Sequence, residues 1–536
     1  MRKKFFLVCI LAIILFCGYF LFLGSYPLLD VDETRYVDMA RSMLKSGDFL
    51  TLYLNGDYFF EKPPLYFWIE CFAFKIFGGT NELMARLPIV LLSLLPLGLL
   101  FGICKKVKDI RYAFITCAVL LTSLEYILIT KIAILDSVLT SLVSSAVLCY
   151  FYTFFTENKN KKYFWCLTYI FTGLAVMAKG IPGLVIPAGT IAVSTIIFKT
   201  YRETFKYAFA GIILFLIIVL PWHILMLKTY PGLFFEEYIY KHHILRFLGS
   251  DVIHRSQPWY FYLLTLLWGL FPHIFVFLPE FFTEIVKKIK TRNINFNFNQ
   301  AGSLEKFLIL NTIAILVSLL FFSSSGAKLI TYILPVYPFF AAIISNMWLQ
   351  YINNDNRTIK VSLIILNTIL LTGAFVLCFA KFVLPPYVYK DFFPIQTISL
   401  LLIIPFTILN LWLTSKNKRF KNFISTVIFI SILSGCLTPS IYKFDYSFGQ
   451  NDLMKFAKFA KENNYTISTY KTGKKYSLLY YSGLNRIDFQ IDDNLNWLDK
   501  ELNKRNHIVI TRNKDLKNLP VKVKIKGVKY SVIEKI

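Results

Sequence analysis

The chain has 536 residues, of which 56% are hydrophobic and 17% aromatic, and its mean hydropathy is +0.55. This composition excludes a set of soluble domains with polar surfaces and indicates a surface that faces lipid. The formal net charge is +26, but most basic residues lie in loops between apolar segments or in the C-terminal tail. An anionic lipid surface is therefore a better partner than nucleic acid.

About thirteen apolar segments approach the roughly 20 residues that a helix needs to cross a membrane. They lie near 5–23, 83–103, 112–129, 133–155, 163–178, 181–198, 207–227, 259–280, 307–323, 329–350, 361–381, 396–414 and 422–441. The sequence predicts an all-α polytopic membrane domain over residues 1–441. The first segment has no small-residue cleavage site after it, which favours a retained anchor over a cleaved signal.

Basic residues fall in every second loop between these segments. Lys and Arg gather, for example, at 105–111, 287–292 and 416–421, and short loops with this bias stay on the cytoplasmic side. The other loops, including 24–82 and 228–258, are expected to face outward. An odd number of spans places the C-terminal segment outside as well.

The first outer loop opens with three acids in four residues, Asp30, Asp32 and Glu33. The following residues, from Arg35 and Tyr36 onward, place apolar side chains at helical spacing, which predicts an amphipathic helix at the membrane surface. Acids at a helix start can serve only as caps. Three of them beside a membrane favour a binding site.

The same loop contains Glu61 and Lys62, directly before Pro63 and Pro64. Such a pair is often a solvated turn. It can also form a site in which Lys binds a phosphate as a point charge, while Glu orients the phosphate or binds a metal ion. The two prolines are expected to hold this stretch extended and rigid.

Single charges lie near the outer ends of several spans. An unpaired carboxylate such as Asp136 is costly there and is a functional candidate by default, although Lys131 could neutralise it. Lys179 and Lys328 are single cations at similar depth. Each can simply extend its charge toward the headgroups.

The second outer loop gathers His242, His243, Arg246, His254 and Arg255. A cation cluster of this kind can bind a phosphate, with Arg supplying two parallel hydrogen bonds. A His could also share a metal ion with a carboxylate. Polar groups therefore collect at the outer face, whereas a transporter would place them near the membrane midplane and often in matching halves.

The composition changes to Lys- and Asn-rich over 442–536. Amphipathic runs at 451–464 and 493–504 predict helices, and alternating runs at 507–512 and 521–536 predict strands. We expect a small soluble α/β domain on the outer side. Its Lys-rich surface either rests on anionic headgroups or only keeps the domain soluble.

Seven motifs, in order over about the first 340 residues, resemble those of the GT-C class of polytopic glycosyltransferases. Within that class they are similar to bacterial aminoarabinose (4-amino-4-deoxy-L-arabinose) lipid A transferases and to the dolichyl-phosphate-mannose-protein mannosyltransferase-like family. The motifs are DETRY (32–36), NGDYFFEKPPLYFW (55–68), ARLP (85–88), AKGIPGLVIP (178–187), HHILRF (242–247), HRSQPWYFY (254–262) and GAKLITYILPVYP (326–338).

The resemblance implies a GT-C fold and transfer of a sugar from undecaprenyl phosphate to a lipid acceptor, at the periplasmic face of a bacterial inner membrane. The roles that it implies are catalytic acids at Asp32 and Asp136, carrier-phosphate binding by Lys62, Arg246, Tyr332 and Lys328, substrate positioning by Glu33, Arg35 and Tyr36, and a possible divalent metal such as zinc at Glu61 and His243. Phe59 departs from the family's Tyr, and His242 is an alternative to His243.

Preorganised cations can stabilise a phosphate leaving group as charge develops on it. A lipid A phosphate needs no strong base, whereas a hydroxyl acceptor needs a carboxylate to take its proton, so Asp32 is either a base or a positioning group. We expect a single displacement with inversion. Transfer of an amino sugar to lipid A is the leading hypothesis. The alternatives are glycosylation of a protein or another surface glycan, and transport of a lipid-linked glycan.

Overall fold

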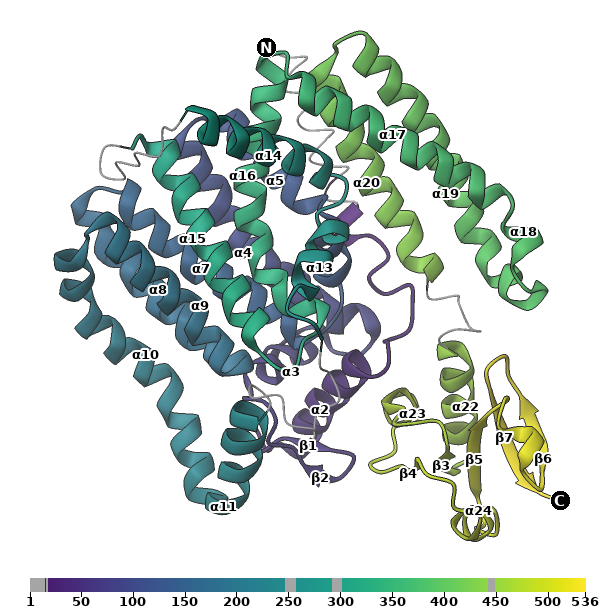
Figure 1. Cartoon of the computed structure of the whole chain (residues 1–536). Helices are drawn as coiled ribbons and strands as arrows, with labels where there is room; N and C mark the ends of the chain where they lie inside the picture. Colours follow the sequence, from purple (N-terminus) through teal and green to yellow (C-terminus); the bar gives the residue numbers. More distant parts are fainter. Residues whose placement is uncertain (1–14, 16–17, 246–256, 292–300, 442–448) are drawn as a thin grey trace.

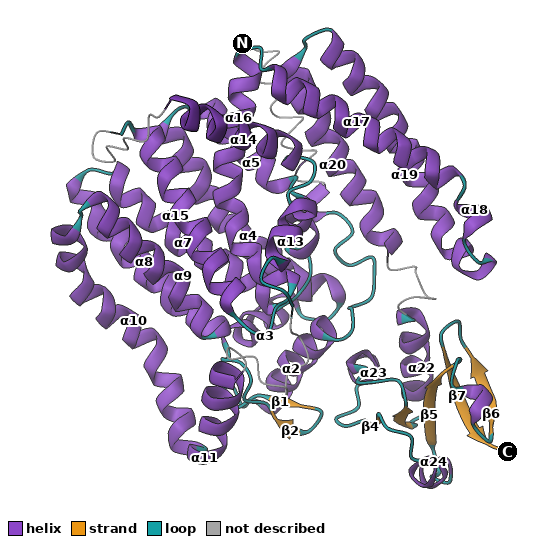
Figure 2. Cartoon of the chain, viewed as in Figure 1, coloured by secondary structure: helices purple, strands orange, loops and turns teal. Residues whose placement is uncertain are grey.

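The computed structural model describes residues 15, 18–245, 257–291, 301–441 and 449–536, which form a large helical domain and a small C-terminal domain of mixed sheet and helices (Figures 1 and 2). Eight helices in this described part are long and apolar enough to cross a membrane. They are α4 (Glu82–Val107), α7 (Leu135–Phe155), α9 (Ile181–Phe198), α10 (Tyr201–Thr229), α15 (Ser303–Ser324), Ile330–Asn353 (η2 with α16), α17 (Arg357–Cys378) and Gln396–Ser415 of α19. A mostly helical polytopic membrane protein is thereby confirmed.

Five of the expected spans are not among these eight. The segment 5–23 lies mostly outside the described residues. Helices α8 (Asn158–Lys179) and α20 (Arg419–Ile441) are 22 and 23 residues long and begin with polar residues. The segments 112–129 and 259–280 are each broken into two helices. The count of thirteen spans stays a prediction.

The two broken segments meet inside the helical domain. The first divides into α5 (Ile110–Leu121) and α6 (Leu124–Ile129), and the second into α13 (Phe261–Gly269) and α14 (Ile274–Thr291). The Leu124 N–H donates to the Phe271 carbonyl at 3.2 Å, and the Thr122 hydroxyl lies 2.9 Å from Nε2 of His273. Non-helical backbone at membrane depth requires such partners, so each break satisfies polar groups of the other.

The first outer loop forms α2 (Asp32–Ser46), the hairpin of β1 (Tyr53–Leu54) and β2 (Asp57–Tyr58), and α3 (Leu65–Phe77). The predicted amphipathic helix is confirmed as α2. Its apolar face, with Val37, Ala40 and Met43, is buried in the protein core, so it does not rest on headgroups. The expectation of an extended Pro63–Pro64 stretch is wrong at Pro64, which has φ −88° and ψ −7° and precedes α3 directly.

The C-terminal domain has a five-stranded sheet in the order β4-β3-β5-β7-β6, with parallel pairing on both sides of β3 and antiparallel pairing on both sides of β7. Its elements are α22 (Gln450–Glu462), β3 (Thr466–Tyr470), α23 (Tyr476–Ser482), β4 (Asp488–Gln490), α24 (Leu495–Leu502), β5 (His507–Arg512), β6 (Val521–Lys526) and β7 (Tyr530–Lys535). The predicted small α/β domain is confirmed, with α23, β3 and β4 added.

This domain packs against the first outer loop, at the lower end of the helical domain in Figure 1. The Tyr481 hydroxyl accepts the Leu28 N–H and donates to Glu82 Oε1, both at 2.8 Å. Asn55 and the backbone of Ile487 exchange two hydrogen bonds of 2.8 and 2.9 Å. Loop and domain therefore lie on the same side, as the predicted topology requires. Part of the surface of the C-terminal domain is bound to this loop, in addition to the part that was expected to face solvent or headgroups.

Candidate active site

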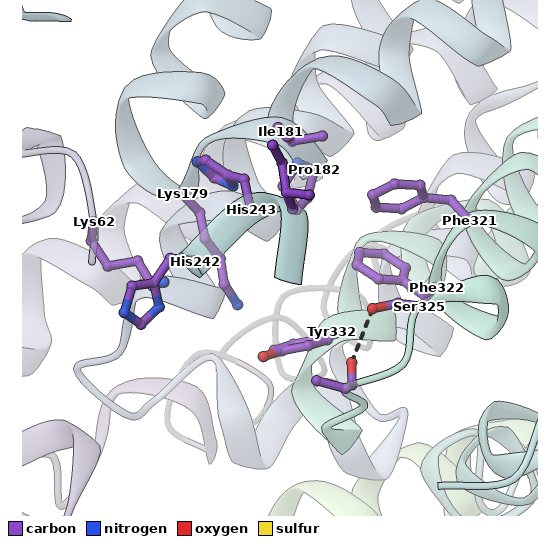
Figure 3. A pocket seen from close by; sticks show the side chains of 12 residues that line it. Lys62, Lys179, Ile181, Pro182, His242, His243, Phe321, Phe322, Ser325 and Tyr332 are labelled. Atoms are coloured by element: carbon purple, nitrogen blue, oxygen red, sulfur yellow. Dashed lines mark hydrogen bonds between the residues drawn. The ribbon is translucent and has the colours of Figure 1, made fainter. Parts of the chain in front are cut away.

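A cavity of about 390 Å³ opens where the ends of several helices meet. Its wall includes Lys62 from the loop before α3, Lys179 at the end of α8, His242 and His243 from the π-helical segment η1 (Phe235–Leu245), Phe321 and Phe322 near the end of α15, and Tyr332 of η2 (Ile330–Val336). In Figure 3, Lys62 and His242 lie on one side, the two phenylalanines lie opposite, and Lys179 extends between them. Cations beside an apolar wall suit a ligand with an anionic head and an apolar chain.

Local backbone geometry explains how two of these side chains reach the cavity. Helix α8 ends because Gly180 takes a positive φ of 82°, a conformation that favours glycine. Lys179 is the last residue of α8, and a cation at a helix C-terminus is favourable. A Cβ on Gly180 would lie 2.5 Å from Cε1 of His243, so glycine lets the imidazole approach this closely. The AKGIPG motif therefore shapes the cavity as well as supplying a cation to it.

Asp136 and Lys179 form an ion pair at the edge of the cavity. Asp136 lies in the first turn of α7, and the Lys179 ammonium donates to its Oδ1. Their side chains are only 14% and 10% exposed. The ammonium also lies 4.1 Å from the ring centroid of Tyr332. Lys131, which could have neutralised Asp136, instead donates to the Gly18 carbonyl.

Asp32 has a more open side chain, which is 46% exposed. Its Oδ1 lies 2.7 Å from Nη2 of Arg35, which also donates to the Tyr36 hydroxyl at 2.8 Å. Burial raises the pKa of Tyr36; Arg35 lowers it, and the charges of Asp32, Asp136 and Glu61 raise it further. Asp32, Asp136 and Glu61 belong to separate motifs, but all three lie close enough to Tyr36 for their charges to act on its neutral hydroxyl.

Glu33 points into the protein core and is 1% exposed. Its carboxylate forms two bonds with Arg86, of 2.7 and 2.8 Å, and accepts the backbone N–H groups of Leu29 and Ala133. The pair joins the DETRY and ARLP motifs. Glu33 can thus act on a substrate only through the backbone that it holds, which differs from the direct positioning role that the resemblance implied.

Lys62 lines the cavity, and its ammonium donates to the Glu61 carbonyl at 2.9 Å. Glu61 and His243 are the two donors predicted for a metal. In the described part of the chain, no group of three or more His, Cys, Asp or Glu side chains gathers to hold a metal ion. Catalytic zinc sites take three protein ligands, so these two residues alone do not fit one, and no step below uses a metal.

Both adjacent histidines line the cavity, so the structure does not select one of them. The ring of His243 packs edge-on against Tyr238 at 4.6 Å, and the Tyr238 hydroxyl lies 3.2 Å from Nε2 of His223. His242 Nε2 lies 3.9 Å from a carboxylate oxygen of Glu237. The support of His243 by His223 and Tyr238 had no signal in the sequence beyond the number of histidines.

Lys328 lies behind the cavity wall rather than in it. Its ammonium donates to the carbonyls of Gln257 and Ser325, at 3.0 and 2.6 Å, and burial lowers its pKa. It therefore holds the turn between α15 and η2, and its contact with a carrier phosphate stays a prediction. Arg246 and His254 lie outside the described residues.

Residues 4–234 match the model of a family described as dolichyl-phosphate-mannose-protein mannosyltransferase, PMT. This match covers the N-terminal part of the chain, from the first apolar segment to α11 (Pro231–Phe234). The fold of the chain matches that of ArnT from Cupriavidus metallidurans bound to undecaprenyl phosphate, with a TM-score of 0.79, 16% identity and coverage of 98% of this chain and 97% of ArnT. The match shows that this chain has an ArnT-like fold.

Two proteins are similar to this chain in sequence. An undecaprenyl phosphate-alpha-4-amino-4-deoxy-L-arabinose arabinosyl transferase of Proteus mirabilis is 29% identical over 328 residues, which are 61% of this chain and 56% of the relative. An uncharacterized protein of Aquifex aeolicus is 29% identical over 399 residues, 73% of this chain and 74% of its own length. The chain thus spans a little over half the length of the arabinosyl transferase that it matches.

Proposed function

We propose that this protein is a membrane glycosyltransferase that takes a sugar from a polyprenyl phosphate carrier, with undecaprenyl phosphate as the carrier. The observation that supports this most directly is the cavity, which sets Lys62, Lys179 and Tyr332 beside an apolar wall. A phosphate joined to an isoprenoid chain has this combination of properties.

The two lysines act on the leaving group. As the bond between sugar and phosphate breaks, negative charge grows on the phosphate oxygens, and fixed cations at the edge of a low-dielectric region stabilise it. Lys179 is already oriented by Asp136. Phe321 and Phe322 offer the apolar surface for the first isoprene units.

Asp32 serves the acceptor. It is the more exposed of the two proposed catalytic acids, and Arg35 orients its carboxylate. For a hydroxyl acceptor it takes the proton as the new bond forms, and for a phosphate acceptor it positions the nucleophile. The sugar passes in a single displacement with inversion, in which the acceptor oxygen bonds to the anomeric carbon while the carrier phosphate leaves.

The acceptor that we propose is lipid A on the periplasmic face of a bacterial inner membrane, and the sugar is an amino sugar such as aminoarabinose. The relatives named as arabinosyl transferases support this choice. The name of the PMT family model supports the second candidate, transfer to a protein. The cavity lies at helix ends rather than at mid-membrane, which favours transfer over transport.

Mass spectrometry of lipid A tests the acceptor, in cells that carry the wild type, a deletion, or Asp32→Asn. A pentosamine- or hexosamine-sized addition should appear only with the wild type. Asp57→Asn is the control, because Asp57 lies in the same outer loop with a side chain 71% exposed, and it should leave the addition intact. Identical lipid A in all strains would exclude this acceptor.

Purified full-length protein in detergent tests the reaction itself, with undecaprenyl phosphate-linked aminoarabinose and lipid A as substrates. Transfer in detergent excludes a pure transporter, because no barrier separates the two sides. Asp32→Asn should lower the rate by about 100-fold or more, the range for loss of a general base. Unchanged transfer by this variant would contradict the role of Asp32.

A further inference from the structure

The segment that carries Asp32 is bound by the C-terminal domain. The half-buried carboxylate of Asp30 accepts the Ser477 N–H at 2.8 Å and the Ser477 hydroxyl at 2.5 Å. The Asp30 N–H donates to Oε1 of Gln450 at 3.3 Å. Within its own loop, the carboxylate accepts the Thr34 hydroxyl at 2.7 Å. Most of these bonds thus come from a distant part of the chain, the C-terminal domain.

The place of Ser477 in α23, the second helix of that domain, explains why its backbone N–H is free to bond outside the helix. Ser477 lies in the first turn of α23, where backbone N–H groups have no partner within their own helix. Asp30 supplies the missing acceptor from another part of the chain. Hydrogen bonds to a charged group are stronger than those between neutral groups, so the Asp30–Ser477 contact holds both partners in place.

Tyr476, the residue before Ser477, is fixed within its own domain. Its ring packs edge-on against Phe489 and is buried. Helix α23 as a whole packs against α2, the helix that begins at Asp32.

We infer that the C-terminal domain is a positioning element of the active site, in which Ser477 fixes Asp30, α23 packs against α2, and Asp32 is thereby held in its working place. The inference rests on the proposed function of Asp32. A displacement of about 1 Å at a reacting group can cost about 100-fold in rate. Glu33 and Arg86 still anchor the segment from the opposite side, so loss of the Asp30–Ser477 contact should loosen it without unfolding the helical domain.

Binding in the cavity is a property that should not change when the contact between Asp30 and Ser477 is lost. Its lining side chains all come from the helical domain, among them Lys62, Lys179 and Tyr332. Binding of undecaprenyl phosphate should therefore not depend on α23. A change at Ser477 should affect turnover and leave carrier affinity as it is.

The experiment uses full-length protein in detergent and compares the wild type with Ser477→Ala and Ser477→Thr. Ser477→Ala should lower the transfer rate about 10-fold to 100-fold, within the cost of misplacement, speed amide hydrogen exchange over 28–36, and leave undecaprenyl phosphate affinity unchanged. Ser477→Thr keeps the hydroxyl and should recover most of the rate. Ser531→Ala is the matched control, because its buried hydroxyl bonds to Asn513, in the same domain but outside α23.

Asp30→Asn removes the negative charge and one of the two acceptor oxygens at the other side of the contact, and it should reproduce the effects of Ser477→Ala. Wild-type transfer and exchange in both variants would overturn the inference. So would a loss of undecaprenyl phosphate affinity equal to the loss of transfer, since that indicates general unfolding. Failure of the proposed function would give a different result, in which Asp32→Asn retains transfer. In that case amide hydrogen exchange over 28–36 still shows whether Ser477 holds the segment.

Discussion

Asp32 and Asp136 are each paired with a cation and lie near the same tyrosine, but they are supported in different ways. Asp136 begins α7, a helix buried on nearly all sides, and its partner Lys179 ends another helix of the same domain. Asp32 begins α2 with a half-exposed side chain, after a segment bound from two directions. Under the proposed function, the donor side of the site is thus built by the helical domain alone, whereas the acceptor side is also supported by a second domain.

The largest effect is expected at Arg86, the inner anchor of the Asp32 segment. Arg86→Met leaves Glu33 buried without its partner, which should lower the free energy of unfolding by about 3–5 kcal/mol. Thermal or denaturant unfolding of the purified protein measures this loss. Arg111→Met is the control, because the exposed Arg111–Asp109 pair should contribute no more than about 1 kcal/mol. Equal stability of both variants would show that the segment does not depend on its inner anchor.

The next effect tests the Asp136 side of the comparison. Lys179→Met removes a cation from the cavity and leaves Asp136 unpaired, so transfer should fall by about 100-fold to 1,000-fold, as for loss of one electrostatic stabiliser. Affinity for undecaprenyl phosphate, measured by titration, should fall with it. Lys241→Met is a matched control, since Lys241 pairs with Glu237 at the surface. Undiminished binding by Lys179→Met would contradict the proposed carrier site.

A smaller effect is expected at Gly180, where the donor side depends on backbone shape. Alanine there would strain a residue with φ +82° and push its Cβ into His243. Affinity for undecaprenyl phosphate should weaken about 10-fold, since displaced groups lose part of their contacts. Gly98→Ala is the control, because nothing lies within 4 Å of a Cβ there. Equal affinities would mean that the imidazole moves aside freely.

The smallest effect concerns the stability of the C-terminal domain at acidic pH. Burial lowers the pKa of His507 from its ordinary 6.5, against the opposing charge of Glu501. As the pH falls below 6.5, the unfolded chain gains a proton that the folded domain does not take up, so the domain loses stability. Hydrogen exchange in β5, corrected for its intrinsic pH dependence, should speed up in mild acid, and His507→Gln should remove that response. An acid response unchanged by His507→Gln would assign it to other groups.

Local patterns predicted much of the fold. The spacing of apolar residues gave α2 and α22, and alternation gave β5 and the hairpin of β6 and β7. Helix α23 was missed because a run of seven residues, Tyr-Ser-Leu-Leu-Tyr-Tyr-Ser, has no readable period. Hydropathy predicts the segments 112–129 and 259–280 as continuous spans. It cannot reveal their breaks, because the polar groups at the two breaks bond to each other.

The candidate site was predictable one residue at a time but not as an arrangement. Motifs marked Lys62 and Tyr332, which do line the cavity. They gave no indication that Lys179, rather than Lys131, pairs with Asp136, because that depends on how two helices pack. Glu33 was grouped with Asp32 as an adjacent acid, yet the two neighbours on α2 point in different directions, one into the core and the other toward an open surface.

The contact between Asp30 and Ser477 joins positions 447 residues apart, and this separation has a consequence for how the protein is made. The acidic segment leaves the ribosome early, while its outer partner emerges only much later. Until the C-terminal domain has been made and has folded, the Asp32 segment lacks its outer support. If the proposed function holds, a newly inserted chain should therefore bind its carrier lipid before it can transfer the sugar.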